Sequence, residues 1–400
     1  PLWLIPLFFF AIATGFFLGR REGKRRQRRR MDSLSQEYVA GLNFLLNEEP
    51  DKAVQALLNS LEVNDQTLET HLSMARLFRK RGEFDRATLI HSHLLEQGEL
   101  PRATQEQIQL ELAEDYLAGG LFDRAEEVLL EMLDQECEKR EQVIRQLTYL
   151  YEQERDWTNA ISMGEHLVKS QPKIAPVLAH YCCEEAEAQI ARSELNPARR
   201  MLRRALGFDK NCVRASVLQG RLEMREEDWN AAIDAFRRIW KQDPDFFDEV
   251  LSELRQCYQA LEKEEDFIRM LADYSAETPS TARVLLLSEQ LRERYGDREA
   301  GQFIADYMQA NPTVLGLHRL IDMNLQGSAE GEAREHLGLL KALTERLTSG
   351  KTIYQCRRCG FQTPLLQWRC PSCRRWGTIK PRSEGEMRSH CLGTNLSFQG

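Results

Sequence analysis

Four cysteines near the end of the 400-residue sequence have the spacing that most clearly predicts chemistry. They are Cys356, Cys359, Cys370 and Cys373, in the pattern C-x2-C-x10-C-x2-C. A two-residue gap lets both sulfurs of a pair point to the same side of a tight turn, and Gly360 can adopt the positive φ that closes the first turn. This pattern predicts one tetrahedral tetrathiolate metal site. A segment of about thirty residues has too little core to fold alone, so we expect the metal to supply its folding free energy.

The two cysteine pairs resemble a rubredoxin or zinc-ribbon knuckle, which we place at residues 351–382. Iron in such a site can carry electrons, whereas zinc cannot. The gap between the pairs is shorter than in electron-carrying rubredoxins, and Arg374 stands where those proteins usually have glycine. We therefore favour a structural metal over an electron-transfer centre. The residues themselves do not choose between iron and zinc.

The remaining candidate residues predict no second site. Cys137, Cys212 and Cys257 fall in helical stretches and are expected to be buried as small hydrophobic side chains. The histidines are scattered and are expected at the surface; His91 and His93 lie two apart and would face different sides of a helix. No phosphate-binding loop, nucleophile elbow, zinc-protease motif or dinucleotide turn is present. The sequence thus predicts a protein that is not an enzyme.

The first nineteen residues, PLWLIPLFFFAIATGFFLG, carry no charge, and eight Lys or Arg residues follow within residues 20–30. Residues 1–19 are long enough for a transmembrane helix, and a cleaved signal peptide would need its positive charge before the apolar stretch. The positive-inside rule then places the rest of the chain in the cytoplasm. We expect the basic linker, residues 20–34, to contact anionic lipid headgroups.

The charge of the remaining chain limits its partners. The net charge is −8, but residues 31–400 hold 46 basic and 61 acidic side chains, a net of −15. A body this acidic is a poor binder of polyanions, so we expect no nucleic acid partner. Because the cytoplasm keeps thiols reduced, the paired cysteines are expected to bind metal rather than to form disulfides.

Residues 35–350 show a helical pattern with a recurring alanine. The alanine returns at intervals of 32 to 38 residues, with one weak unit near Ile268 in place of it: Ala53, Ala87, Ala125, Ala160, Ala198, Ala232, Ala300 and Ala333. Twelve residues earlier a small residue is frequent, as at Ala75, Ala113 and Gly220, and an aromatic residue often follows it by three, as at Phe78 and Tyr116. Small residues where two helices cross allow the close packing of a helical hairpin.

The period resembles the tetratricopeptide repeat and predicts an all-α superhelix of about nine helix pairs. Its concave groove, built from the first helix of each pair, usually binds a peptide or a segment of another protein. The alternative is a generic helical bundle. The recurring Phe, Trp and Tyr residues are expected in the core rather than in a ligand site.

The order of parts is more specific than any one of them: a membrane helix, tetratricopeptide repeats and a C-terminal four-cysteine knuckle. Together with Gly120-Leu-Phe-Asp-Arg-Ala-Glu126 and Trp368-Arg-Cys-Pro-Ser-Cys-Arg374, it resembles the lipopolysaccharide assembly protein B family of Gram-negative bacteria. The resemblance extends to about Pro381. The polar tail, residues 383–400, has no counterpart and is expected to be disordered.

This resemblance implies a single-pass adaptor of the bacterial inner membrane with most of its chain on the cytoplasmic side. Such proteins are thought to present the committed deacetylase of lipid A synthesis to the membrane-bound protease FtsH, and a periplasm-facing membrane sensor is thought to oppose them. The resemblance also favours iron at the four cysteines. Two other functions remain open: a passive scaffold for lipopolysaccharide synthesis or transport enzymes, and an electron-transfer module. A homodimer is possible, and the groove residues that bind each partner are unknown.

One further expectation concerns the knuckle. We expect it to fold back on the last repeats, seated by the aromatic residues beside its cysteines, so that the groove and the knuckle form one docking surface.

Overall fold

The computed structural model describes Phe44, Lys52 and residues 65–96, 100–135, 137–278, 280–327, 331–348 and 354–382. The predicted transmembrane helix (1–19), the basic linker (20–34), Ala53 of the first repeat and the polar tail (383–400) lie outside these residues. Within the described ranges, no helix is both long and apolar enough to cross a bilayer.

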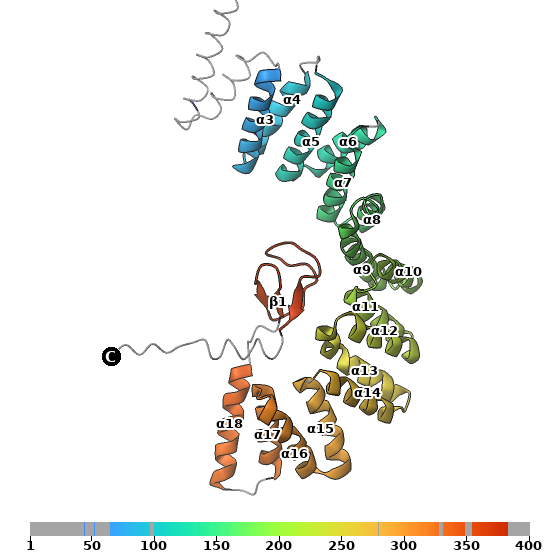
Figure 1. Cartoon of the computed structure of the whole chain (residues 1–400), viewed down its shortest axis with the longest axis vertical. Coiled ribbons are helices and arrows are strands. Elements are labelled where there is room, and N and C mark those ends of the chain that lie inside the picture. Colours follow the sequence, from blue (N-terminus) through green and yellow to red (C-terminus); the bar gives the residue numbers. More distant parts are fainter. Residues whose placement is uncertain are drawn as a thin grey trace, which may run out of the picture. The chain divides into compact units, whose positions relative to one another are not determined.

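The chain divides into two compact units, residues 1–167 and residues 168–400. In the first unit the described residues form three antiparallel helix pairs, coloured blue to green in Figure 1. These helices are α3 (Asp65–Lys80), α4 (Phe84–Glu96), α5 (Arg102–Gly119), α6 (Phe122–Asp134), α7 (Arg140–Glu154) and α8 (Trp157–Glu165).

The second unit continues the helix pairs and adds a small three-stranded sheet (Figure 1). Its helices are η1 (Pro172–Ile174), α9 (Ala175–Ala191), α10 (Leu195–Phe208), α11 (Val213–Arg225), α12 (Trp229–Gln242), η2 (Pro244–Val250), α13 (Leu251–Ala260), α14 (Glu264–Glu277), α15 (Thr281–Tyr295), α16 (Asp297–Ala310), α17 (Val314–Gly327) and α18 (Glu332–Thr348), where η denotes a 3₁₀ helix. The strands are β1 (Tyr354–Cys356), β2 (Gln362–Thr363) and β3 (Ile379–Pro381).

The recurring alanine is the centre of each hairpin. Its side chain is fully buried at six of the positions found in the sequence, namely Ala87, Ala125, Ala160, Ala198, Ala232 and Ala300. Each of these amides donates a hydrogen bond to the carbonyl four residues earlier, at the start of the second helix of its pair. The tetratricopeptide-like packing predicted from the period is therefore present in both units.

The two degenerate repeats differ from this pattern. In the weak unit the equivalent amide belongs to Phe267, which bonds to the carbonyl of Lys263, so the core position lies one residue before Ile268. Phe267 is buried, and Ile268 is only partly buried. Ala333, the last recurring alanine, is exposed, and the equivalent amide in α18 belongs to Glu335, which bonds to the carbonyl of Gly331 two residues before Ala333.

The turns inside the hairpins need a positive φ where the first helix ends. Gly82 and Gly120 meet this need, but Arg155, Ser193 and Glu227 occupy the same place in later hairpins with φ between 60° and 65°. Left-handed residues at helix C-termini satisfy the last carbonyls, and glycine adopts this conformation at the least cost. These three hairpins thus accept backbone strain that glycine would relieve.

Histidine is the residue type for which the sequence-based expectation was wrong. His71, His91 and His180 are buried rather than exposed. His91 is held in the first unit by Asp115, with Nδ1 2.5 Å from Oδ2, and Asp115 also accepts a hydrogen bond from Arg79. Such partners offset the cost of burying His91, whereas both ring nitrogens of His71 and Nδ1 of His180 have no hydrogen-bond partner among the described residues.

We predict that Gly220→Ala destabilises the second unit. A methyl group at Gly220 would lie 2.3 Å from Cε1 of Phe236, which is fully buried and cannot move aside. Overpacking of this kind costs about 1–3 kcal/mol. Chemical denaturation of the purified protein, followed by far-UV circular dichroism, should show a lower midpoint.

The matched control is Gly207→Ala in α10, where an added methyl group meets no atom within 4 Å. Alanine is a better helix former than glycine, so this variant should be unchanged or more stable by roughly 0.5–1 kcal/mol. Equal midpoints for the two variants would contradict the close packing at Gly220.

Candidate metal centre

Two similar turns build the candidate site. In the first, the amide of Gly360 donates to the carbonyl of Cys356, and in the second the amide of Arg374 donates to the carbonyl of Cys370. Gly360 has φ of 77° and Arg374 has φ of 56°, so both turns close with a left-handed residue. Arg374 therefore adopts the conformation for which glycine is the usual choice, and the unusual residue at this place does not alter the turn.

A short antiparallel sheet holds the two turns together. The strand order is β2-β1-β3, with Tyr354 opposite Thr363 on one side and Cys356 opposite Ile379 on the other. The second turn is closed by an isolated bridge between Arg369 and Trp376. The sheet thus fixes Cys356 on β1 and brings the second cysteine pair against it.

The four cysteine sulfurs lie within 4.8 Å of one another. Cys356 Sγ is 3.7 Å from Cys373 Sγ, and Cys359 Sγ is 3.6 Å from Cys370 Sγ, so each close contact joins the two turns. Four sulfurs bound tetrahedrally at about 2.3 Å from a zinc ion would be about 3.8 Å apart. The structure brings together the four residues that the sequence predicts, in an arrangement suited to one metal ion.

The pKa values of the four cysteines differ, because their surroundings stabilise the thiolate form to different extents. Burial raises the pKa of Cys356, but the Thr378 hydroxyl, 3.3 Å from Sγ, and neighbouring backbone amides together lower it to about 6. Backbone contact at Phe361 lowers the pKa of Cys359, whereas burial raises that of Cys370 to about 11. A bound cation would stabilise the charged form of every ligand, and most of all the buried Cys370.

The knuckle is strongly basic. Residues 354–382 contain seven Lys or Arg and no Asp or Glu. A divalent metal with four thiolates carries a net charge of −2, so this composition offsets the charge of the site. The same excess of positive charge complements the acidic repeats, as in the ion pair between Lys380 Nζ and Asp243 Oδ2 at 2.7 Å.

The knuckle packs on the repeats of the second unit through two tryptophans. Trp376 stacks on His180 with ring centroids 5.4 Å apart, and it meets Tyr181 edge-on. Trp368 stacks on Phe246 with centroids 5.5 Å apart. In Figure 1 the knuckle accordingly lies on the side of α9 and α11 that faces away from α10 and α12.

This contact corrects the expectation that the knuckle folds on the last repeats. It packs on α9, α11 and η2, because these elements carry the aromatic, basic and acidic side chains that match its own. Tyr354 adds a hydrogen bond from its hydroxyl to Glu249 Oε2 at 2.6 Å. The aromatic seating itself was expected correctly.

The repeat side of this contact was missed by sequence reasoning. His180, Arg214, Phe246 and Glu249 stand alone in helical segments, without a motif around them. The one available hint is Arg214, a charged residue on an apolar helix face; it is 3% exposed, and its guanidinium lies 5.9 Å from the centroid of the Trp376 ring.

Three cysteines outside the knuckle, Cys137, Cys212 and Cys257, are buried as expected. Of these, only Cys257 lies within a helix, because Cys137 and Cys212 lie in the connections before α7 and α11. Among the described residues, the four knuckle cysteines form the one cluster suited to a metal ion.

We expect Cys370→Ser to abolish metal binding while leaving the repeats folded. Cys370 is fully buried at the centre of the knuckle, and a structural metal supplies most of the folding free energy of so small a segment. Elemental analysis should find one metal ion per chain in the wild type and almost none in the variant, with nearly unchanged helical circular dichroism. Cys137→Ala, outside the site, should keep its metal; a Cys370→Ser protein that retains one ion per chain would contradict the assignment.

Trp376→Ala should separate docking from metal binding. It removes two aromatic contacts, each worth about 0.5–1.5 kcal/mol beyond area burial, while sparing all four sulfurs. The metal content should stay at one per chain, and hydrogen exchange of the knuckle strands should become about tenfold faster. Leu365→Ala, at a side chain that is 70% exposed, is the control and should leave exchange unchanged. Unaltered exchange in Trp376→Ala would show that the tryptophan does not hold the knuckle.

Comparison with known proteins agrees with this two-part architecture. Residues 354–381 match the family described as rubredoxin metal binding domain, and residues 223–291 match the tetratricopeptide repeat. Lipopolysaccharide assembly protein B of Escherichia coli K12 is 36% identical over 382 residues, which cover 94% of this chain and 96% of that protein. The protein of the same name from Haemophilus influenzae is 32% identical over 395 residues, covering 96% and 98% of the two chains. The chain therefore belongs to the lipopolysaccharide assembly protein B family.

Proposed function

We propose that this protein is a non-enzymatic adaptor of the bacterial inner membrane that limits lipopolysaccharide synthesis. It promotes the FtsH-dependent proteolysis of the deacetylase that commits precursors to lipid A. The observation that carries the proposal is the pairing of a tetratricopeptide-like scaffold with a metal knuckle, in a chain related along nearly its whole length to proteins named for lipopolysaccharide assembly.

The helix pairs support binding rather than catalysis. Stacked hairpins expose long surfaces built from many similar helices, and such surfaces bind segments of other proteins. On the second unit the knuckle covers part of the surface formed by α9 and α11, so a partner there would contact repeats and knuckle together. The deacetylase is the partner we assign to this combined surface.

Membrane attachment is the second element of the proposal. The uncharged residues 1–19 would anchor the chain, and the basic residues 20–30 would hold anionic lipid headgroups on the cytoplasmic side. FtsH is itself a membrane protease. Anchoring adaptor and protease in one bilayer raises their effective concentration for each other, so weak contacts between them suffice.

The other assignments follow from the family. A periplasm-facing sensor in the inner membrane would oppose the adaptor, and two copies of the chain could associate as a homodimer. The metal would be iron, as the family resemblance favours, or zinc. In either case it would supply structure, by holding the knuckle in the shape that docks on the repeats.

A passive scaffold is the second candidate. The relatives are named for assembly and not for degradation, which favours a protein that only gathers lipopolysaccharide enzymes. The two functions differ in one consequence, because a scaffold alone leaves the lifetime of the deacetylase unchanged.

Depletion of this protein should lengthen the half-life of the deacetylase several-fold. The measurement is the decay of the deacetylase after translation is stopped, in cells with and without the protein. Restoring the wild type or the Gly207→Ala variant should restore rapid decay, whereas Cys370→Ser should not. An unchanged half-life would contradict the adaptor function and favour the passive scaffold.

A further inference from the structure

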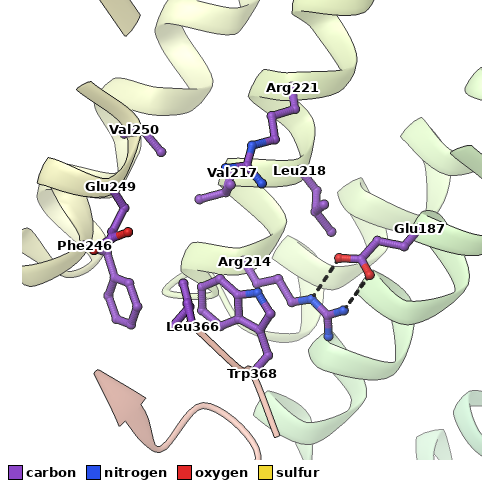
Figure 2. A pocket seen from close by; sticks show the side chains of 10 residues that line it. All are labelled: Glu187, Arg214, Val217, Leu218, Arg221, Phe246, Glu249, Val250, Leu366 and Trp368. Atoms are coloured by element: carbon purple, nitrogen blue, oxygen red, sulfur yellow. Dashed lines mark hydrogen bonds and ion pairs between the residues drawn. The ribbon is translucent and has the colours of Figure 1, made fainter. Parts of the chain in front are cut away.

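A cavity of about 200 Å³ lies where the knuckle meets the repeats (Figure 2). Side chains from α9, α11, η2 and the knuckle line it: Glu187, Arg214, Val217, Leu218, Arg221, Phe246, Glu249, Val250, Leu366 and Trp368. A cavity of 150 Å³ can hold a benzene-sized group, whereas drug-sized ligands need about 300 Å³ or more. The space therefore suits one long side chain rather than a cofactor.

Two facing walls of the cavity are apolar, and charged side chains complete its lining. Val217 and Leu218 form one side, and Leu366 and Trp368 of the knuckle form another, as Figure 2 shows. Methylene groups would pack against these walls, and the face of the Trp368 indole attracts cations. The cavity reaches solvent, because the Arg221 and Glu187 side chains at its rim are 55% and 43% exposed.

Both arginines of the cavity already have carboxylate partners. Arg214 lies 2.8 Å from a Glu184 oxygen and 3.0 Å from a Glu187 oxygen, the latter pair drawn in Figure 2. Arg221 lies 3.0 Å from Glu253. The charge of each guanidinium is therefore balanced by at least one carboxylate.

Glu249 is the charged group that lacks a counter-ion. Its Oε2 accepts a hydrogen bond from the Tyr354 hydroxyl, and no Lys, Arg or His of the described residues forms an ion pair with it. Burial, followed by the nearby carboxylates of Asp248 and Glu253, raises its pKa, against the lowering effects of Tyr354 and Arg221. An uncompensated carboxylate in a partly buried place is costly, and a cation beside it would remove that cost.

The charges around the cavity therefore sum to a negative value. Arg214 is outweighed by its two glutamates, Arg221 is balanced by Glu253, and Glu249 remains, so the cluster carries a net charge of −2. We propose that this cavity receives a basic side chain, lysine or arginine, from a partner protein, with its methylene stem between Leu218 and Trp368 and its charge beside Glu249. Which protein supplies this side chain rests on the proposed function. The preference of the cavity for a basic side chain is independent of that function.

The first test uses a small probe and needs no partner protein. Nα-acetyl-lysine methylamide is titrated into the full-length protein in detergent, and the indole resonance of Trp368, assigned by its loss in Trp368→Phe, reports binding. Nα-acetyl-norleucine methylamide keeps the stem without the charge. The expected dissociation constant is in the millimolar range for lysine, and at least tenfold weaker for norleucine.

Three variants locate the probe. Glu249→Gln, which can still accept the Tyr354 hydrogen bond, should weaken lysine binding about tenfold, and Leu218→Trp should fill the cavity and abolish it. Glu293→Gln, at an exposed carboxylate on α15, is the matched control and should bind as the wild type does. Equal affinity for lysine and norleucine, or for wild type and Glu249→Gln, would overturn the proposal.

Stability measurements keep these variants interpretable. Because the pKa of Glu249 is raised in the folded protein, the folded state binds this proton more tightly than the unfolded state, and folding loses stability as pH rises through the folded-state pKa. Glu249→Gln should therefore be at least as stable as the wild type at neutral pH. The advantage should disappear at pH values below the pKa of an unfolded glutamate. Lost binding in a folded and more stable variant cannot be ascribed to unfolding.

The second test joins the cavity to the proposed function. Binding of the purified deacetylase to the full-length protein is compared for wild type, Glu249→Gln and Glu293→Gln. If the wild type binds the deacetylase and Glu249→Gln binds it about tenfold more weakly, the basic side chain comes from the deacetylase. If the wild type does not bind the deacetylase, the adaptor proposal fails. The titration with the lysine probe still tests, independently, whether the cavity binds a basic side chain.

Discussion

The close approach of two helices at a buried small residue is the contact on which the rest of this structure depends. Ala232 and Gly220 allow α11 and α12 to pack with Phe236 between them, and the same arrangement recurs at Ala87 and Ala125. Once each hairpin has formed, its first helix packs beside the first helix of the next hairpin. Without this packing, the side chains that receive the knuckle would not share a surface.

Polar pairs one repeat apart tie the first helices to one another. In the first unit Arg79 bonds to Glu111 on the next first helix. In the second unit Arg255 pairs with Glu289, which also pairs with Arg319. These pairs are partly buried, so a charge left without its partner would be costly, and the pairs thereby fix the register between neighbouring hairpins. The apolar cores supply the stability, and the charged pairs select the arrangement.

The sequence was most informative where structure repeats or where a metal dictates spacing. The recurring alanine predicted the hairpin cores, and the C-x2-C spacing predicted all four metal-ligating sulfurs. Both patterns are local in sequence, and close helix packing and tetrahedral metal binding each require a narrow range of geometries. The weak repeat was misplaced by one residue, since a phenylalanine, Phe267, replaces the alanine. The rest depended on contacts between distant residues. Tyr354 and Glu249 are 105 positions apart, and no local pattern records that such residues will meet.

The docked knuckle changes how the second unit is connected. Tetratricopeptide-like hairpins contact only their neighbours, so their stability is close to a sum of local terms and their ends can open separately. Trp376 contacts His180 on α9 and Trp368 contacts Phe246 on η2, so the knuckle connects these elements across the α11–α12 hairpin. The metal knuckle therefore links repeats that are not neighbours in the linear series of hairpins. It makes the opening of α9, α11 and η2 one cooperative event, and couples it to occupancy of a site made of four sulfur atoms.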